Sequence, residues 1–437
     1  MTSIQFAMQA PYKTAIYLPA VQGGYLDLID AGDRVERKLP EGVNIDDLAF
    51  WTGKSNIFNH KFCLYSVGGQ QVGSSFINPL FRGNIGNHTV VGDSGGFQIA
   101  NGTLKGLVNL EQGIDGDSAL SAWKFENYDA KDWILSSLNT YFDYSMTIDM
   151  PLSVRNRKNE NSPFHKCTEE QLIEMTVDNL IFIEEHQLNL TKWLNVIHGT
   201  DITSFEKWWN AVKFFKQGGW ALAGGVGWRG GLYNVLYALL TMRDEGAFSK
   251  GDNWVHMLGV SQPVWSVLFT AIQRELRKIN PELQISFDSS SPFLTGGKFD
   301  QYANIPSLSK DIESWGISYE LLDAVQSNFQ NSALAFPNNP TLLGERIEMG
   351  HLVIREGMFE ARRIDNLSNQ LLANHNIWVY LDAVERANAI AFGTERHLLP
   401  DTLRNALEII EEAFNVRNWR EFVKNNKSVL DALAPSE

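Results

Sequence analysis

From about residue 88 onward, the chain alternates short apolar runs with longer amphipathic stretches. Each apolar run ends in glycine or a polar residue, which is typical of buried strands that stop at loops. The runs cover residues 88–93, 145–150, 193–199, 220–225, 254–260 and 283–289. Two earlier apolar pieces, 13–21 and 60–67, lie in a segment otherwise rich in Gly, Asn and aromatic residues. We expect short strands and loops there rather than a separate helical domain.

Helical patterns lie between several of these runs and fill the C-terminal part. They cover residues 168–187, 203–217, 261–279, 366–392 and 401–425. The first opens with Thr168 and Gln171 in the spacing of a capping box. The second carries a stripe of aromatic residues at helical spacing, which indicates a face packed on a sheet. We therefore expect each of these stretches to be a helix.

Strands that alternate with helices predict a parallel sheet. The later strand starts fall about 30 residues apart, the size of one β/α unit. There are too many units for a small open sheet, and no G-x-G-x-x-G follows the first strand. The sequence predicts an α/β fold, a (β/α)8 TIM-like barrel with N-terminal strand and loop additions and C-terminal helices. We expect one domain over residues 1–437, with the core at about 85–390.

Composition places the chain among ordinary globular proteins, with 44% hydrophobic and 20% charged residues. It contains no apolar run of about 18 residues, so we expect no membrane span. The N-terminus lacks the basic start and apolar stretch of a secretory signal. The two cysteines, Cys63 and Cys167, suit a reducing compartment and are too few for a disulfide framework. Together these features predict a cytoplasmic protein.

The charge balance is acidic, with 37 Lys and Arg against 51 Asp and Glu and a net charge of −14. This argues against a protein that coats nucleic acid non-specifically, because non-specific affinity for phosphate comes from basic residues. Basic residues do gather in two stretches, one with Arg155, Arg157 and Lys158 and one within 355–363. Solvated surface charge and contact with a nucleic-acid backbone both remain open for them.

Acidic residues follow several of the expected strands. In a β/α barrel the working residues lie at the C-terminal strand ends. Those positions hold Asp93, Asp149, His198, Gly224 with Gly225, Gly259 and Asp288. One aspartate at such a place usually caps a helix, whereas three at equivalent places point to chemistry.

Carboxylates around one pocket are typical of reactions at a glycosidic carbon. One carboxylate attacks the anomeric carbon while the other gives and removes a proton, so their proton affinities must differ. Asp93, Asp149 and Asp288 have no H-x-x-x-H or C-x-x-C companion. We therefore expect neither a metal nor a cofactor.

Four motifs in this order give the chain a resemblance to the queuine/archaeosine tRNA-guanine transglycosylases. They are DSGGFQ (93–98), WALAGGVG (220–227), HMLGV (256–260) and SFDSSSP (286–292), with a weaker likeness at 371–390. Members of that family are β/α-barrel enzymes that exchange a guanine base for a 7-deazaguanine. The resemblance therefore implies base exchange by a pentosyltransferase.

The resemblance also implies roles for individual residues. Asp288 matches the nucleophile on the sugar C1′, and Asp93 matches the general acid/base. The positions that match the base pocket are Asp149, Gly224, Gly225, Phe97, Ser94, Gln98, Leu258 and His198. Phe97 is placed like the ring that stacks on the base, and His198 stands where the family usually has a glutamine. Ser289 and Ser290 are expected either to cap a helix or to meet a phosphate.

One part of the family pattern is missing. The tRNA enzymes follow the nucleophile with a C-x-C-x-x-C…H zinc site, whereas this chain has no cysteine after Asp288. Without this zinc site, the chain resembles the zinc-less DNA-guanine transglycosylases, which place bases such as preQ0 into DNA. The implied partners are DNA and a free 7-deazaguanine base, with helper proteins of a DNA-modification system as further candidates. Exchange in tRNA by a zinc-less enzyme and a catalytically inactive binding subunit remain as alternatives.

Overall fold

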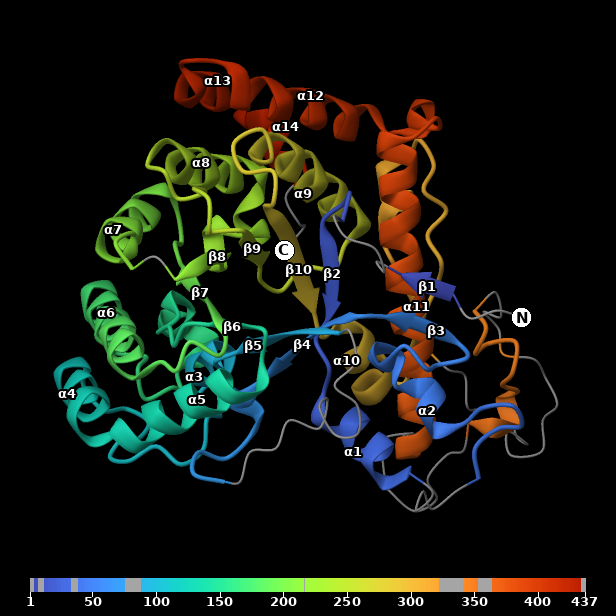
Figure 1. Cartoon of the computed structure of the whole chain (residues 1–437), viewed down its shortest axis with the longest axis horizontal. Helices are drawn as coiled ribbons and strands as arrows, with labels where there is room; N and C mark the ends of the chain where they lie inside the picture. The colour runs from blue at the N-terminus through green and yellow to red at the C-terminus, as the bar shows by residue number, and fades with distance from the viewer. Residues whose placement is uncertain are drawn as a thin grey trace.

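Eight parallel strands form a nearly closed TIM-like barrel (Figure 1). The computed structural model describes residues 4–6, 12–32, 38–74, 88–215, 217–321, 336, 341–352 and 364–433. The barrel strands are β2 (Ile16–Pro19), β4 (Phe62–Ser66), β5 (Thr89–Asp93), β6 (Tyr144–Met146), β7 (Lys192–Ile197), β8 (Gly218–Leu222), β9 (Trp254–Met257) and β10 (Gln284–Ser289). Their order is β2-β10-β9-β8-β7-β6-β5-β4. The two edges approach where Val21 donates a hydrogen bond to the Leu64 carbonyl at 2.8 Å.

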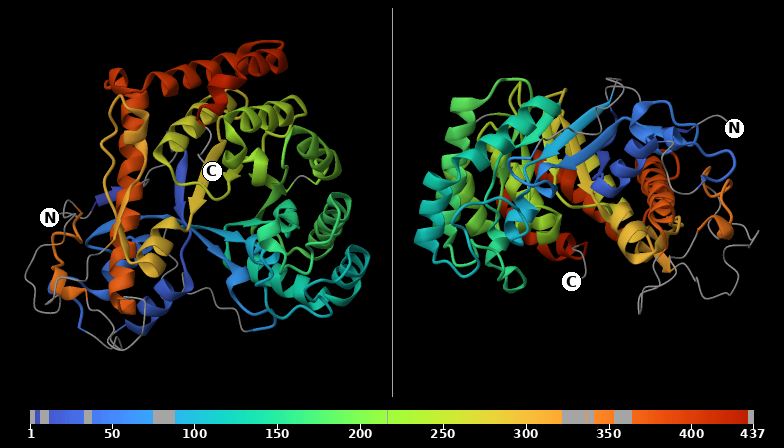
Figure 2. Two further views of the ribbon diagram at one scale, coloured as in Figure 1. Left: turned by 180° about the vertical axis from the view of Figure 1, so that it is seen from behind. Right: turned by 90° about the horizontal axis from the view of Figure 1, so that it is seen from below.

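Helices follow the strands and surround the barrel (Figure 2). They are α1 (Gly23–Ala31), α2 (Ile45–Leu48), α3 (Gly96–Ala100), α4 (Gly116–Glu126), α5 (Tyr128–Tyr141), α6 (Glu169–His186), α7 (Ile202–Val212), α8 (Gly231–Asp244), α9 (Pro263–Leu276) and α10 (Ser291–Phe299). The capping box predicted for Thr168 and Gln171 opens α6, as expected. The outer layer thus alternates with the strands as a β/α barrel requires.

The C-terminal part is helical and packs on one side of the barrel (Figure 1). It comprises α11 (Asn366–Phe392), α12 (Asp401–Asn415), α13 (Trp419–Asn425) and α14 (Lys427–Asp431). The long α11 lies against α9 and α10, and α12 also contacts α9. Two small sheets flank this side, β1 (Ile4–Phe6) parallel to β3 (Phe58–His60) and β11 (Gln301–Ala303) antiparallel to β12 (Tyr319–Leu321).

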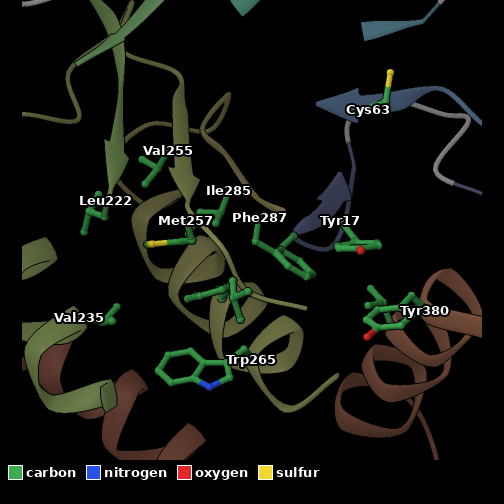
Figure 3. Packing of buried hydrophobic residues seen from close by; sticks show 14 of the residues in the cluster. Tyr17, Cys63, Leu222, Val235, Val255, Met257, Trp265, Ile285, Phe287 and Tyr380 are labelled. Carbon is green, nitrogen blue, oxygen red and sulfur yellow. The ribbon is translucent and has the colours of Figure 1, made fainter. Parts of the chain in front are cut away.

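Both faces of the barrel wall are buried, as is usual for a parallel sheet. The inner face holds a small apolar cluster that includes Leu18, Leu64, Val196, Ala221 and Trp254. The outer face packs on the helices, and Figure 3 shows this packing around β9, β10 and β2. There Val255, Met257, Ile285, Phe287 and Tyr17 lie in one cluster with Trp265 of α9 and Tyr380 of α11. Successive residues of each strand therefore alternate between the two cores.

The predicted strands are confirmed, but the boundary of the core is not. We expected the barrel to begin near residue 85, whereas β2 and β4 supply two of its eight strands. Those two strands pair with each other only through the isolated bridge Ala20–Leu64, so the N-terminal segment is what closes the barrel.

The helix predicted over residues 203–217 begins one residue earlier than expected, at Ile202, and also ends earlier. Asp201 caps it by accepting from the Ser204 backbone N–H, and it stops at Val212. Within the described part of the chain, no helix has both the length and the apolar character to cross a membrane.

His375 of α11 ties the C-terminal helix to its neighbours from a fully buried position. Its Nε2 lies 3.0 Å from the Ala303 carbonyl, and its Nδ1 lies 3.0 Å from the Thr341 hydroxyl. Because a carbonyl only accepts, Nε2 carries the proton and Nδ1 accepts. Burial disfavours the charged imidazolium and lowers the pKa of His375 to about 4, which the Ala303 carbonyl partly opposes.

We predict that this histidine makes folding stability fall in mild acid. The unfolded chain takes up the proton near the ordinary pKa of 6.5, whereas the folded chain resists it until about 4. Stability is therefore lost as pH falls between those values, by roughly 3 kcal/mol when complete. Denaturant unfolding from pH 7 to pH 4 should show a shallower decline for His375→Gln than for the wild type. An unchanged decline would contradict the prediction, and the exposed His397→Gln serves as the matched control.

Candidate active site

Three carboxylates meet at one end of the barrel. Asp93 is the last residue of β5, Asp288 is the second-last of β10, and Asp149 lies three residues beyond β6. Parallel strands bring their C-terminal ends to the same rim. The negative charges of Asp149 and Asp288 both raise the pKa of Asp93, so the three groups are close enough to interact. The acids that we expected at the barrel mouth are thus brought together there.

Asp93 has a proton affinity that suits proton transfer near neutral pH. Burial is the largest cause of its raised pKa, and the charges of Asp149 and Asp288 add to it. Contacts with the Ser66 hydroxyl and the Gly95 N–H oppose the rise. The result is a pKa of about 6, up from the ordinary 3.8. Near neutral pH such a group both gives and takes a proton.

Asp149 forms a buried pair with His198. The Nε2 of His198 lies 2.6 Å from Oδ2 of Asp149, and the Ser94 hydroxyl lies 3.5 Å from Oδ1. The imidazole is held edge-on to the ring of Trp208, with 4.8 Å between the centroids. A Cβ on Gly96 would sit 3.1 Å from both carboxylate oxygens, so this glycine leaves the room that Asp149 occupies.

Asp288 is held through a single oxygen. Its Oδ1 accepts the Gly259 backbone N–H at 2.9 Å and lies 3.1 Å from Nε2 of His256. His256 is fully buried and was given no role in the sequence analysis, although it lies within the HMLGV motif. The signal that could have found it is a histidine in an otherwise apolar strand, two residues before Leu258.

Phe97, four residues after Asp93, presents an exposed aromatic ring. Gly95, with a φ of 96°, makes the sharp turn between β5 and α3. Phe97 is the second residue of that helix, and its side chain is 74% exposed. An exposed ring of this size is a suitable platform for a flat base. Leu258 lies half-buried above the apolar cluster inside the barrel.

Ser94 and Gln98 lie beneath the rim rather than open to it. The Ser94 hydroxyl is fully buried and donates to the Thr147 carbonyl at 3.1 Å. Gln98 packs its side-chain oxygen near Gly68 and lines a cavity of about 270 Å³ with Leu104. The predicted contact of Ser94 and Gln98 with a base stays a prediction.

The glycine pair after β8 lies against the loop that follows β7. Gly224 has a φ of +66°, which favours glycine. A Cβ on Gly225 would come within 2.4 Å of the Thr200 carbonyl oxygen, so only glycine fits. The Gly225 N–H donates to the Gly199 carbonyl at 2.6 Å. Close packing of two loops thus accounts for both glycines, and their contact with a base edge stays a prediction.

The predicted backbone-binding residues lie around the same mouth. Arg155, Arg157 and Lys158 are exposed in the loop that also carries Asp149. Arg155 lies 3.9 Å from a carboxylate oxygen of Glu169. The second basic stretch, at 355–363, lies outside the described residues.

Ser289 and Ser290 stand at the start of α10. The Ser289 hydroxyl accepts the Ser291 backbone N–H at 3.0 Å, and the two hydroxyls lie 2.7 Å apart. Ser289 therefore acts as a local cap. Its contact with a phosphate, and that of the half-buried Ser290, stay predictions.

In the described part of the chain, no group of three or more His, Cys, Asp or Glu side chains has the arrangement of a metal site. Comparison of the sequence with protein-family models finds no match, and comparison with curated proteins finds none either. The carboxylates at the barrel mouth and the sequence motifs that carry them are therefore the features that bear on function.

Proposed function

We propose that this protein is a DNA-guanine transglycosylase, which replaces guanine in DNA by a 7-deazaguanine such as preQ0. The observation that carries the proposal is that two carboxylates at the barrel mouth, Asp93 and Asp288, lie in different environments. Asp93 has a pKa of about 6, while Asp288 is anchored by hydrogen bonds to one of its oxygens. A carboxyl that can hold a proton beside an anchored carboxylate is the equipment of a double displacement at a sugar carbon.

The first displacement releases guanine. The target nucleotide leaves the base stack, at a cost of a few kcal/mol. A carboxylate oxygen of Asp288 bonds to C1′ while the bond between C1′ and N9 of guanine breaks, and Asp93 gives its proton to the departing base. The products are free guanine and a deoxyribosyl ester of Asp288.

The second displacement inserts the new base. The N9 of a 7-deazaguanine attacks C1′, the ester bond to Asp288 breaks, and the Asp93 carboxylate takes the proton from N9. Both aspartates return to their starting states, and two inversions give retention at C1′. One glycosidic bond replaces another, so the step consumes neither a nucleoside triphosphate nor a cofactor.

The Asp149–His198 pair and Phe97 form the pocket for the base in this proposal. Guanine and its 7-deaza analogues share the N1–H and the exocyclic amino group, and an ionised carboxylate such as Asp149 only accepts hydrogen bonds. One pocket therefore suits both the leaving and the entering base. His198 holds one oxygen of Asp149 at 2.6 Å, which fixes the direction in which the carboxylate accepts.

Assignment of DNA as the polymer follows from the motif resemblance. The chain has no cysteine after Asp288, so it lacks the zinc site that accompanies the tRNA enzymes. The exposed Arg157 and Lys158, in the loop that carries Asp149, supply positive charge for a phosphate backbone.

We predict that a 7-deazaguanine deoxynucleoside accumulates in the DNA of cells that contain the wild-type protein. Nucleoside mass spectrometry of DNA and of tRNA should find it in DNA alone. It should be absent from cells without the protein and from cells with Asp288→Ala, because that variant has no nucleophile. A 7-deazaguanine that depends on the protein in tRNA alone would favour the zinc-less tRNA enzyme. Its presence in DNA with Asp288→Ala would contradict the mechanism.

We predict that guanine release slows as pH rises through the pKa of Asp93. Only the protonated acid assists departure, so the single-turnover rate should fall about tenfold per pH unit above about 6. Asp149→Asn removes a negative charge that raises this pKa, so its decline should begin at lower pH. The measurement is release of labelled guanine from an oligodeoxynucleotide without an entering base. A flat rate between pH 6 and pH 8 would argue against Asp93 as the acid.

We predict that Phe97→Ala weakens binding of the base and leaves the fold unchanged. Loss of an aromatic platform costs about 1–3 kcal/mol per stacked base, and the ring is 74% exposed, so its removal leaves little packing to lose. The KM for the entering base should rise about tenfold or more, while the melting temperature stays at the wild-type value. Phe97→Tyr keeps the ring and is the matched control. If Phe97→Ala keeps the wild-type KM, the ring of Phe97 does not contribute to base binding.

A further inference from the structure

A line of hydrogen bonds runs inside the barrel from Trp254 to Asp288. The indole Nε1 of Trp254 lies 2.7 Å from the Ser286 hydroxyl, which lies 2.8 Å from Nδ1 of His256. The Nε2 of His256 lies 3.1 Å from Oδ1 of Asp288. Ser286 and His256 are directly paired neighbours on β10 and β9, and both are fully buried. The alternate residues Val255 and Phe287 belong to the outer core (Figure 3).

With a neutral imidazole, the two ends of this line are compatible with one direction for each hydrogen bond in it. An indole N–H only donates and an ionised carboxylate only accepts. The Ser286 oxygen accepts from Trp254, and at the other end Nε2 of His256 must donate to the carboxylate of Asp288. In a neutral imidazole the Ser286 hydroxyl therefore gives its proton to Nδ1. Nδ1 is then the acceptor, and the proton of the neutral imidazole stays on Nε2, which donates to Asp288. The neighbours thus select one tautomer.

Both donors to Asp288 converge on the same oxygen. The Gly259 N–H at 2.9 Å and the Nε2–H of His256 both meet Oδ1. Oδ2 accepts no hydrogen bond from the residues that the structure describes. Two donors on one oxygen fix the plane of the carboxylate and leave the other oxygen unoccupied by the protein.

We infer that His256 is a positioning residue, held by Ser286 and Trp254, that presents Oδ2 of Asp288 as the oxygen that bonds to C1′. The inference rests on the proposed base exchange. In the first displacement Oδ2 forms the ester bond while Oδ1 keeps both hydrogen bonds and becomes the ester carbonyl. In the second, those same donors stabilise the negative charge that returns to the carboxylate as the bond between Oδ2 and C1′ breaks. His256 keeps its proton throughout.

The surroundings of this line argue against a purely incidental arrangement. It crosses the inner core beside apolar residues such as Leu18 and Val196, where an unpaired polar group is costly. Each donor in the line is matched to an acceptor, and such a fully paired network rigidifies the groups at its ends. The group at its end is Asp288.

The first test measures the tautomer and does not depend on activity. In protein labelled with ¹⁵N-histidine, the ring nitrogens of His256 are identified by their loss in His256→Gln. The inference predicts a neutral ring with the proton on Nε2. A proton on Nδ1 overturns it, whether or not the protein exchanges bases.

The second test measures turnover with the full-length protein and a guanine-containing oligodeoxynucleotide. His256→Phe keeps a planar ring but no donor, and we expect kcat for guanine release to fall about a hundredfold, with KM for DNA unchanged. His256→Gln, whose amide nitrogen mimics Nε2, should recover part of that loss. Wild-type kcat in His256→Phe, a change in KM alone, or no recovery with Gln would overturn the inference. If the wild-type protein exchanges no base, the proposed function is refuted instead. The measurement of the His256 tautomer would still test the direction of the hydrogen bonds.

Discussion

The cost of burying charge governs the mouth of this barrel, and repulsion adds to that cost because the parallel strands bring three carboxylates to one rim. Placing acids so close raises the free energy of the fully ionised state. The protein relieves the repulsion by giving each acid a different environment. Asp149 pairs with His198, Asp288 is anchored by Gly259 and His256, and Asp93 holds a proton more readily than an ordinary aspartate. The distinct chemical roles that we propose follow from these three environments.

The rest of the barrel keeps those environments apart. β2 and β4 close the wall between β10 and β5, so Asp288 and Asp93 lie on strands separated by two others. The glycines at 224 and 225 let the loops after β7 and β8 approach closely. On the outer side, α11 packs on α9 and α10 and is held by the buried His375. A site that depends on small differences in proton affinity needs such a rigid support.

Much of this arrangement could be predicted from the residues. The apolar runs identified every barrel strand, and the long helix α11 begins and ends at the expected residues, because its pattern is continuous and has a clear start and end. The positions of the acids at strand ends followed from the same pattern. The role of β2 and β4 could not be predicted, since closure depends on pairing between segments far apart in the chain.

Contacts inside the site were also beyond the reach of local patterns. His256 is one polar residue in an apolar strand, and only its register beside Ser286 shows that it faces Asp288. The close approach of Gly225 to Thr200 likewise joins two loops that no spacing rule connects. In both cases the decisive fact is a distance between neighbouring strands or loops.

The central claim is that Asp288 becomes covalently bound to deoxyribose. The most direct measurement incubates the wild-type protein with a guanine-containing oligodeoxynucleotide and no entering base, then denatures it and maps the modified peptide by mass spectrometry. The account predicts an oligonucleotide attached at Asp288, released guanine in equal amount, and no adduct in Asp288→Asn. An adduct on Asp93, or guanine release by the wild-type protein without any adduct on Asp288, would contradict it.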